Sequence, residues 1–174
     1  HDNLTSIPVD GGSRTFSSAG GVMFSKDKTT LVCYPCAKKG AYTIPSTVST
    51  IEAFAFSECM GLTGITIPSS VRTIGVQAFS YCTGLDFVAI PEGVRVIDEG
   101  AFLDAELSGI SVPKSVTSIG YYALNNTDDD GNFLPVKKIK YAGTKAAWEN
   151  IATVGEFDDD FSFRDYLRGA SMEF

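Results

Sequence analysis

An Ile-Pro or Val-Pro dipeptide recurs along this chain of 174 residues at an almost constant interval. The four copies, at spacings of 23, 23 and 22 residues, are Ile44-Pro45, Ile67-Pro68, Ile90-Pro91 and Val112-Pro113. Each Pro is followed by Val three residues later and by Ile six residues later, and then by Ala-Phe or, in the last copy, Ala-Leu. One unit of this length cannot bury its own apolar positions, so its copies must stack on one another. The pattern therefore restricts the chain to repeat architectures.

The consensus L-x-x-I-x-I-P-x-x-V-x-x-I-x-x-x-A-F-x-x-C describes one turn of a coil. The alternating apolar positions before Pro predict a short strand with one buried face. Pro ends that strand because it has no N–H to give to a ladder. V-x-x-I predicts a second side of the coil, and A-F-x-x-C predicts a tight helical or 3₁₀ turn whose Phe fills the core. Strands of successive rungs are expected about 4.8 Å apart.

Both ends of the chain carry weaker copies of the unit. Leu4–Val9 predicts a first rung strand, and Gly21–Tyr34 predicts a hairpin that turns at Lys26–Thr29. Near the other end, Val136–Tyr141 predicts a last strand, and Lys145–Ile151 predicts a short amphipathic cap. We divide the chain into a solenoid over 1–154 and an acidic tail over 155–174. The solenoid comprises an atypical first rung with the hairpin (4–43), regular repeats (44–124), an insertion (125–135) and a capping rung (136–154).

The repeat unit resembles the leucine-rich repeat of the BspA-like bacterial surface proteins. Gly21–Pro35 is similar to a hairpin often interleaved with those repeats, and Tyr141–Thr144 with Trp148 resembles their closing element. The resemblance covers about residues 4–152. The departures from it are a one-residue deletion before Leu107, the insertion and the stretch after Val154. It implies adhesion or partner binding, outside the cell or at its surface, in place of catalysis.

Repeat and resemblance together predict a β-rich α/β solenoid of about five or six rungs. The coil is expected to be right-handed, with rungs of about 23 residues and one parallel sheet on its concave side. Short strands or 3₁₀ turns are expected on the convex side. Such a fold accounts for a hydrophobic content of 44% in a chain with few helix formers.

Composition sets several classes of function aside. The net charge is −7 and no basic run is present, so the electrostatic footprint of nucleic-acid binding is missing. No stretch of 18 apolar residues predicts membrane insertion. The chain opens without Met or a leader-like segment and reads as a piece of a longer protein.

Candidate catalytic residues are few. His1 is the single histidine, which leaves no material for a Ser-His-Asp, Cys-His or His-based zinc site. Glycosidase-type catalysis needs two carboxylates that converge in a cleft. The repeat register places Glu52, Asp98 and Glu99 on the outer coil and Asp86 on a strand, so none of these carboxylates converge. We expect a protein that is not an enzyme and that has no cofactor.

The four cysteines form two groups. Cys33 and Cys36 have the C-x-x-C spacing of redox and metal sites, but no further Cys pair or His completes a metal tetrahedron. Two separately packed thiols are the favoured interpretation, with a local disulfide or a functional pair as alternatives. Cys59 and Cys82 occupy one repeat position on adjacent rungs, within disulfide range. Because parallel ladder positions point their Cβ atoms the same way, we expect buried free thiols there.

Asn126, Asp128 and Asp130, followed by Gly131, imitate the first half of a calcium loop. The position that needs a bidentate Glu falls on Lys137, a cation. A solvated polar turn inserted between rungs is therefore favoured over a metal site.

The outward face of the predicted strands is the candidate partner-binding surface, and most of its side chains are small and polar. Phe87 adds one large aromatic near its middle, as a binding hot spot does. The lysines make the last rung locally basic, which could steer an acidic partner. The candidate residues are Thr43, Thr63, Thr66, Asp86, Phe87, Ser108, Ser111, Lys137, Lys138 and Lys140.

Each of these features has a plainer interpretation. Phe87 could lie under a neighbouring side chain, and the lysines could protect an edge strand or pair with the acidic tail. The favoured function is a module of a larger secreted or surface-anchored bacterial protein that binds a host or bacterial surface protein. The alternatives are a carbohydrate- or cell-wall-binding module and a structural spacer that presents another domain. A glycan module usually adds an exposed Trp or Tyr, and Trp148 reads as a cap.

Overall fold

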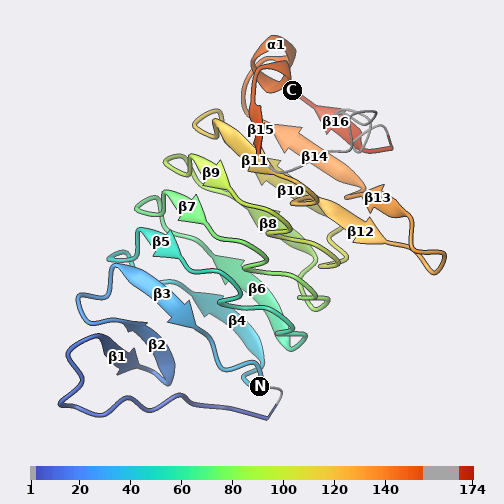
Figure 1. Cartoon of the computed structure of the whole chain (residues 1–174). Helices are drawn as coiled ribbons and strands as arrows, with labels where there is room; N and C mark the ends of the chain where they lie inside the picture. Colours follow the sequence, from blue (N-terminus) through green and yellow to red (C-terminus); the bar gives the residue numbers. More distant parts are fainter. Residues whose placement is uncertain (1–2, 155–168) are drawn as a thin grey trace.

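The chain winds into a coil of stacked rungs, which Figure 1 shows from the side. The structure is a computed structural model that describes residues 3–154 and 169–174. Each regular rung contributes a strand before its Pro, a two- or three-residue strand after it, and a turn. Strands predominate, and the large sheet is parallel from β3 onward, which confirms the predicted leucine-rich repeat solenoid.

The four V-x-x-I segments form the middle of one continuous sheet of eight strands, which strands of the first rung and of the last rung extend at its two ends. Its order is β1 (Phe16–Ala19), β2 (Val22–Ser25), β3 (Thr30–Cys33), β5 (Thr50–Ile51), β7 (Thr73–Ile74), β9 (Val96–Ile97), β11 (Ser118–Gly120) and β15 (Ala152–Val154). Ile51, Ile74 and Ile97 are in register on successive strands, and all three are buried. The second side of the coil is therefore built from short strands, as predicted.

The strands before each Pro form two parallel sheets, so the prediction of one sheet was wrong. One sheet holds β4 (Gly40–Thr43) and β6 (Leu62–Thr66). The other has the order β16 (Ser171–Glu173), β14 (Lys138–Tyr141), β10 (Gly109–Val112) and β8 (Phe87–Ala89). The register between β4 and β6 shifts at Gly40/Ala41, where Thr63 is the extra residue. Such a bulge bends a strand, and we attribute the break between β6 and β8 to it.

The first rung differs from its prediction. The hairpin is confirmed, because β2 and β3 pair antiparallel, and β1 pairs with β2 as an additional strand. Residues 4–9 form no strand. Isolated bonds hold them, including one from Ile7 N to the Gly21 carbonyl and one from Ala37 N to the Leu4 carbonyl. Pro8 has no N–H to extend these bonds into a ladder.

The A-F-x-x-C segments form turns in place of the expected helical or 3₁₀ turn. Phe54 and Glu58 have φ of 59° and 64°, in the left-handed region, and Gln77 and Tyr81 repeat this one rung later. A helix needs consecutive negative φ values, so it cannot form here. The amides of Phe54 and Glu58 instead donate to carbonyls of the next rung. We call the outer side of these segments, residues 52–60, 75–83, 98–106 and 120–127, the turn face.

Aromatic rings stack through the middle of the coil. The ring centroids of Phe56 and Phe79 lie 4.8 Å apart, and those of Phe79 and Phe102 lie 5.1 Å apart. Tyr34 extends this stack to the first rung, 4.9 Å from Phe56. All four rings are buried, which is the continuous ladder that stacking of the repeat predicts.

The last rung is closed by α1 (Lys145–Glu149). Thr144 caps this helix, because its Oγ1 accepts a hydrogen bond from Ala147 N. Trp148 and Ile151 pack against the core, and the Trp148 ring lies 5.1 Å from that of Tyr141. The segment covers the last rung as expected.

The insertion forms a second hairpin, β12 (Asn125–Thr127) with β13 (Phe133–Pro135), which projects from the side of the coil in Figure 1. The Phe133 ring stacks 3.9 Å from that of Tyr122. Among the described residues, no helix has the length and apolar content needed to cross a membrane.

Candidate binding surface

The outward side chains of the two parallel sheets fall into two columns, which together we call the strand face. Register relates the residues of a column within each sheet, and the 23-residue repeat relates β6 to β8. The first column is Ala41, Gly64, Phe87, Gly109, Lys138 and Ser171. The second column is Thr43, Thr66, Ala89, Ser111, Lys140 and Glu173. The register of the strands thus places side chains from distant parts of the sequence beside one another.

The ten candidate residues lie on or beside this face. Nine of them are exposed and Ser111 is half-buried. Asp86, Ser108 and Lys137 come just before their strands, and Thr63 is the bulge residue of β6. The main chains of Asp86 and Ser108 are joined by a hydrogen bond of 2.8 Å from Ser108 N to the Asp86 carbonyl. The surface is formed by both parallel sheets.

Phe87 on β8 pairs in register with Gly109 on β10. Its side chain is 50% exposed. A Cβ added to Gly109 would lie 3.3 Å from Phe87 Cδ2, so the ring leans over that glycine. The ring buries the Gly109 backbone and keeps its other side open to solvent. Phe87 therefore lies over Gly109 and is not, as the plainer interpretation proposed, covered by a neighbouring side chain.

The lysines of β14 are only partly neutralised. Lys138 Nζ lies 2.6 Å from Glu173 Oε1 on β16. The hydrogen bond from Lys138 lowers the pKa of Glu173, and the charges of Lys138 and Lys140 act in the same direction. The pairing partner is thus the last strand of the described chain, whereas the acidic run Glu156–Asp160 lies outside the described residues. Lys137 and Lys140 are exposed.

In the calcium-like segment, backbone amides of the same turn donate hydrogen bonds to the Asp128 carboxylate. Asp128 Oδ1 accepts from Asp130 N at 3.0 Å and from Asn132 N at 2.8 Å. These bonds lower the pKa of Asp128, with the Asn132 side chain as the largest cause. Asn126 Oδ1 accepts from Glu106 N on the neighbouring rung. The described residues contain no group of three or more His, Cys, Asp or Glu that could hold a metal ion.

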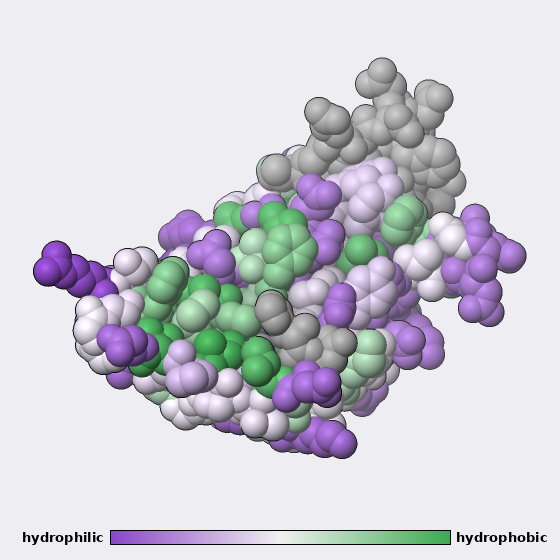
Figure 2. Space-filling model, turned by 60° about the horizontal axis from the view of Figure 1, so that its bottom comes forward, coloured by the Kyte–Doolittle hydropathy of each residue, from purple (hydrophilic) through white to green (hydrophobic). Residues whose placement is uncertain are grey.

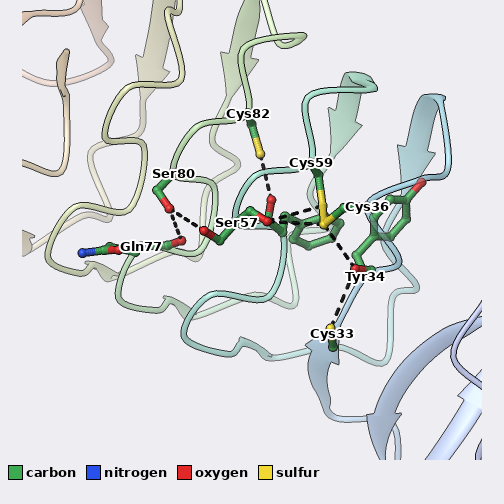
Figure 3. The surroundings of a disulfide bond; sticks show 9 residues. Cys33, Tyr34, Cys36, Ser57, Cys59, Gln77, Ser80 and Cys82 are labelled. Atoms are coloured by element: carbon green, nitrogen blue, oxygen red, sulfur yellow. Dashed lines mark hydrogen bonds between the residues drawn. A yellow bond between two sulfur atoms is a disulfide. The ribbon is translucent and has the colours of Figure 1, made fainter. Parts of the chain in front are cut away.

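The prediction of free thiols is wrong for two of the four cysteines and is confirmed for the other two. Cys36 and Cys59 form a disulfide, with Cα atoms 4.3 Å apart, and Cys33 and Cys82 are free (Figure 3). Cys59 and Cys82 do not pair with each other, in agreement with the argument from parallel positions, but that argument did not consider Cys36, which lies in the turn after β3. The spacing carried the missing signal, since Cys36, Cys59 and Cys82 are each 23 residues apart.

The turn face carries a hollow that sequence reasoning missed. It measures about 340 Å³ and is lined by Tyr81, Thr83, Asp104, Glu106, Asn126 and Thr127. Glu58, Tyr81, Asp104 and Asn126 are one repeat column, at spacings of 23, 23 and 22 residues. The same periodicity that gave the core ladders would have found this outer column.

The end of the coil that lies lowest in Figure 1 is partly apolar. Figure 2 shows hydrophobic side chains gathered on this face, with hydrophilic ones at its margins. Leu4 and Phe16 of the first rung are 44% and 38% exposed.

A family model and solved structures both relate this chain to leucine-rich repeat proteins. The BspA type leucine rich repeat region matches residues 33–132 in six copies. A leucine rich cell surface protein of Faecalibacterium prausnitzii has a similar structure, with a TM-score of 0.63 and 25% identity over 90% of this chain and 46% of that one. A leucine rich repeat protein of T. pallidum has a TM-score of 0.54 and 26% identity over 77% of this chain and 60% of that one.

The chain thus spans about half the length of the solved structures that it resembles. A comparison with curated proteins gives no match. The family match covers more than half of the chain and coincides with the rungs described above. The chain belongs to the BspA-type leucine-rich repeat family.

Proposed function

We propose that this chain is a non-catalytic binding module of a larger secreted or cell-surface bacterial protein, and that it holds a protein partner on the strand face. Exposed Phe87 in the middle of this polar face is the observation that carries the proposal. The similar F. prausnitzii structure is a cell surface protein, which supports the proposed location.

The strand face has the anatomy of a protein interface. Large aromatic side chains near the centre of an interface supply much of the binding free energy, and polar neighbours exclude water around them. Phe87 leans over Gly109, and the matching position of the preceding repeat is Gly64, which has no side chain. A partner side chain can therefore reach the open side of the half-exposed ring.

The lysines of the strand face would attract an acidic partner. Lys137 and Lys140 lie at one end of the strand face, on a protein with a net charge of −7. Rim charges of this kind act mainly on the association rate and on its salt dependence. The proposed partner therefore presents an apolar pocket or ridge to Phe87 and acidic groups to β14.

The test uses a panel of immobilised plasma and extracellular-matrix proteins with the purified chain in solution. For the panel member that binds, Phe87→Ala is expected to weaken the equilibrium dissociation constant about tenfold or more, because it removes the central anchor. Replacing Lys137, Lys138 and Lys140 together by Glu is expected to lower the association rate and to abolish its decrease with salt.

Phe54→Ala is the matched control, since Phe54 is 56% exposed but lies on the turn face. It should bind as the parent does, and circular dichroism should show the same fold in all variants. Parent-like binding by both the Phe87 and the lysine variants would place the partner on another surface. Failure of every panel member to bind would favour the structural spacer.

A further inference from the structure

The hollow on the turn face lies at the junction of three rungs, and the strand-face proposal does not use it. Its volume of about 340 Å³ is at the lower end of the range of small-ligand sites. We propose that it is a subsite for one neutral sugar residue of a glycan, separate from the protein-binding strand face.

The Tyr81 ring supplies the apolar surface that a sugar needs. Its side chain is 44% exposed, and it lies between the rungs of Glu58 and Asp104. The Asp104 charge, burial and a hydrogen bond with the Asp104 carboxylate raise the pKa of Tyr81, and Glu58 adds to the effect. The ring lines the hollow together with Asp104 and forms its exposed aromatic wall. The C–H face of a pyranose can pack on such a ring.

The polar lining offers both donors and acceptors. Asp104 accepts from Thr127 N and from Thr127 Oγ1, so its position is fixed by the hairpin. Because Asn126 Oδ1 accepts from Glu106 N at 3.0 Å, its Nδ2 is the donor that this side chain offers to a ligand. Thr83 adds a hydroxyl, and the Glu106 carboxylate adds an acceptor. Adjacent sugar hydroxyls can each donate and accept a hydrogen bond, so they can pair with both the donors and the acceptors of this lining.

The same lining selects against charged ligands. The carboxylates of Asp104 and Glu106 would repel an acidic sugar. A guanidinium or ammonium group would gain from the carboxylates, but it offers no acceptor to the Asn126 amide or to the Thr83 hydroxyl. A neutral sugar is the ligand class that uses the ring and both kinds of polar group.

The test is ligand-observed saturation-transfer NMR on the whole chain. The probes are methyl glycosides of galactose and mannose, N-acetylglucosamine oligomers, N-acetylneuraminic acid and a tri-arginine peptide. We expect saturation of at least one neutral sugar and of neither charged probe. Saturation of galactose or mannose would indicate that the ligand is a glycan of another cell. Saturation of N-acetylglucosamine oligomers would indicate a cell-wall polymer.

Tyr81→Ala should abolish the saturation, whereas Tyr81→Phe should retain most of it because the ring remains. Phe54→Ala is the matched control, since it removes another exposed aromatic from the left-handed position of a turn. Phe87→Ala should leave the sugar signal unchanged, which separates this site from the strand face. Saturation of no neutral sugar, equal saturation in Tyr81→Ala, or Tyr81-dependent binding of tri-arginine alone would each overturn the proposal.

Discussion

Cys36, Cys59 and Cys82 occupy one column of the coil, yet they differ in chemical state. The turn at Cys36 brings its Cα to 4.3 Å from that of Cys59, and these two form the disulfide. Cys82 remains a thiol that donates to the Phe56 carbonyl at 3.0 Å (Figure 3). Burial raises the pKa of Cys82 to about 12 and also raises that of Cys33.

Reduction of the Cys36–Cys59 disulfide is expected to lower the free energy of unfolding by about 2–4 kcal/mol, because the bond closes a loop of 23 residues in the unfolded chain. Urea titration with and without reductant measures this difference. Cys33→Ser, which leaves the disulfide intact, is the control. Peptide mapping without reductant should find the 36–59 link, and a 33–36 or 59–82 link would contradict the structure.

Thiol labelling at pH 8 separates the two free cysteines. Cys33 is half-buried and should react with iodoacetamide in the folded protein. Cys82 is fully buried and should react only after unfolding, since its thiolate is strongly disfavoured in the fold. Equal labelling of both cysteines in the folded state would contradict this assignment.

At the scale of the element, the hairpin of β2 and β3 depends on one exposed carboxylate. Asp27 accepts hydrogen bonds from Ser25 Oγ at 2.7 Å, from Thr29 Oγ1 at 2.8 Å and from Thr29 N at 3.1 Å. These bonds favour the charged form and lower the pKa of Asp27 to about 2. The ionised side chain therefore stabilises the turn.

Asp27→Asn should lower the stability of the protein at pH 7. Because the pKa is depressed on folding, the contribution is present above the unfolded value of 3.8 and is lost as the pH falls through about 2. Urea midpoints of the parent and the variant should therefore differ at pH 7 and converge near pH 2. Glu52→Gln, at an exposed carboxylate of the turn face, is the control and should show no such convergence.

Periodicity predicted the elements that stacking determines and failed where local backbone geometry decides. The rung strands, the hairpin and the cap at Trp148 follow from apolar spacing and turn residues. The alternating left-handed residues of the turn face, such as Phe54 and Glu58, are invisible to that reasoning, because neither residue favours positive φ. The bulge at Thr63, where the register of β4 and β6 shifts, is likewise not encoded in the repeat.

The candidate sites divide in the same way. Strand register allowed the outward residues of the strand face to be predicted, Phe87 and the lysines among them. The hollow at Tyr81 depends on turn geometry and on the hairpin that brings Thr127 to Asp104. Its residues come from three rungs and match no short motif, so only the column spacing could have indicated them.

At the scale of the whole molecule, each rung packs only on its two neighbours. The stack from Tyr34 to Phe102 and the register of Ile51, Ile74 and Ile97 join adjacent rungs in sequence. In such a coil, stability is a sum of rung and neighbour contributions, and the middle is supported from both sides. Opening should therefore begin at the ends.

Amide hydrogen exchange followed by mass spectrometry is expected to show the slowest exchange in β7 and β9 and faster exchange towards β1 and β15. Phe79→Ala, which removes the middle ring of the stack, should speed exchange most in those two central strands. The substitution should also lower the free energy of unfolding by about 3–5 kcal/mol, because it leaves a cavity in the core. Phe54→Ala, at an exposed ring, should leave the profile unchanged. Uniform protection from β1 to β15, or a Phe79→Ala effect spread evenly over all rungs, would show that the coil opens as one cooperative unit instead of from its ends.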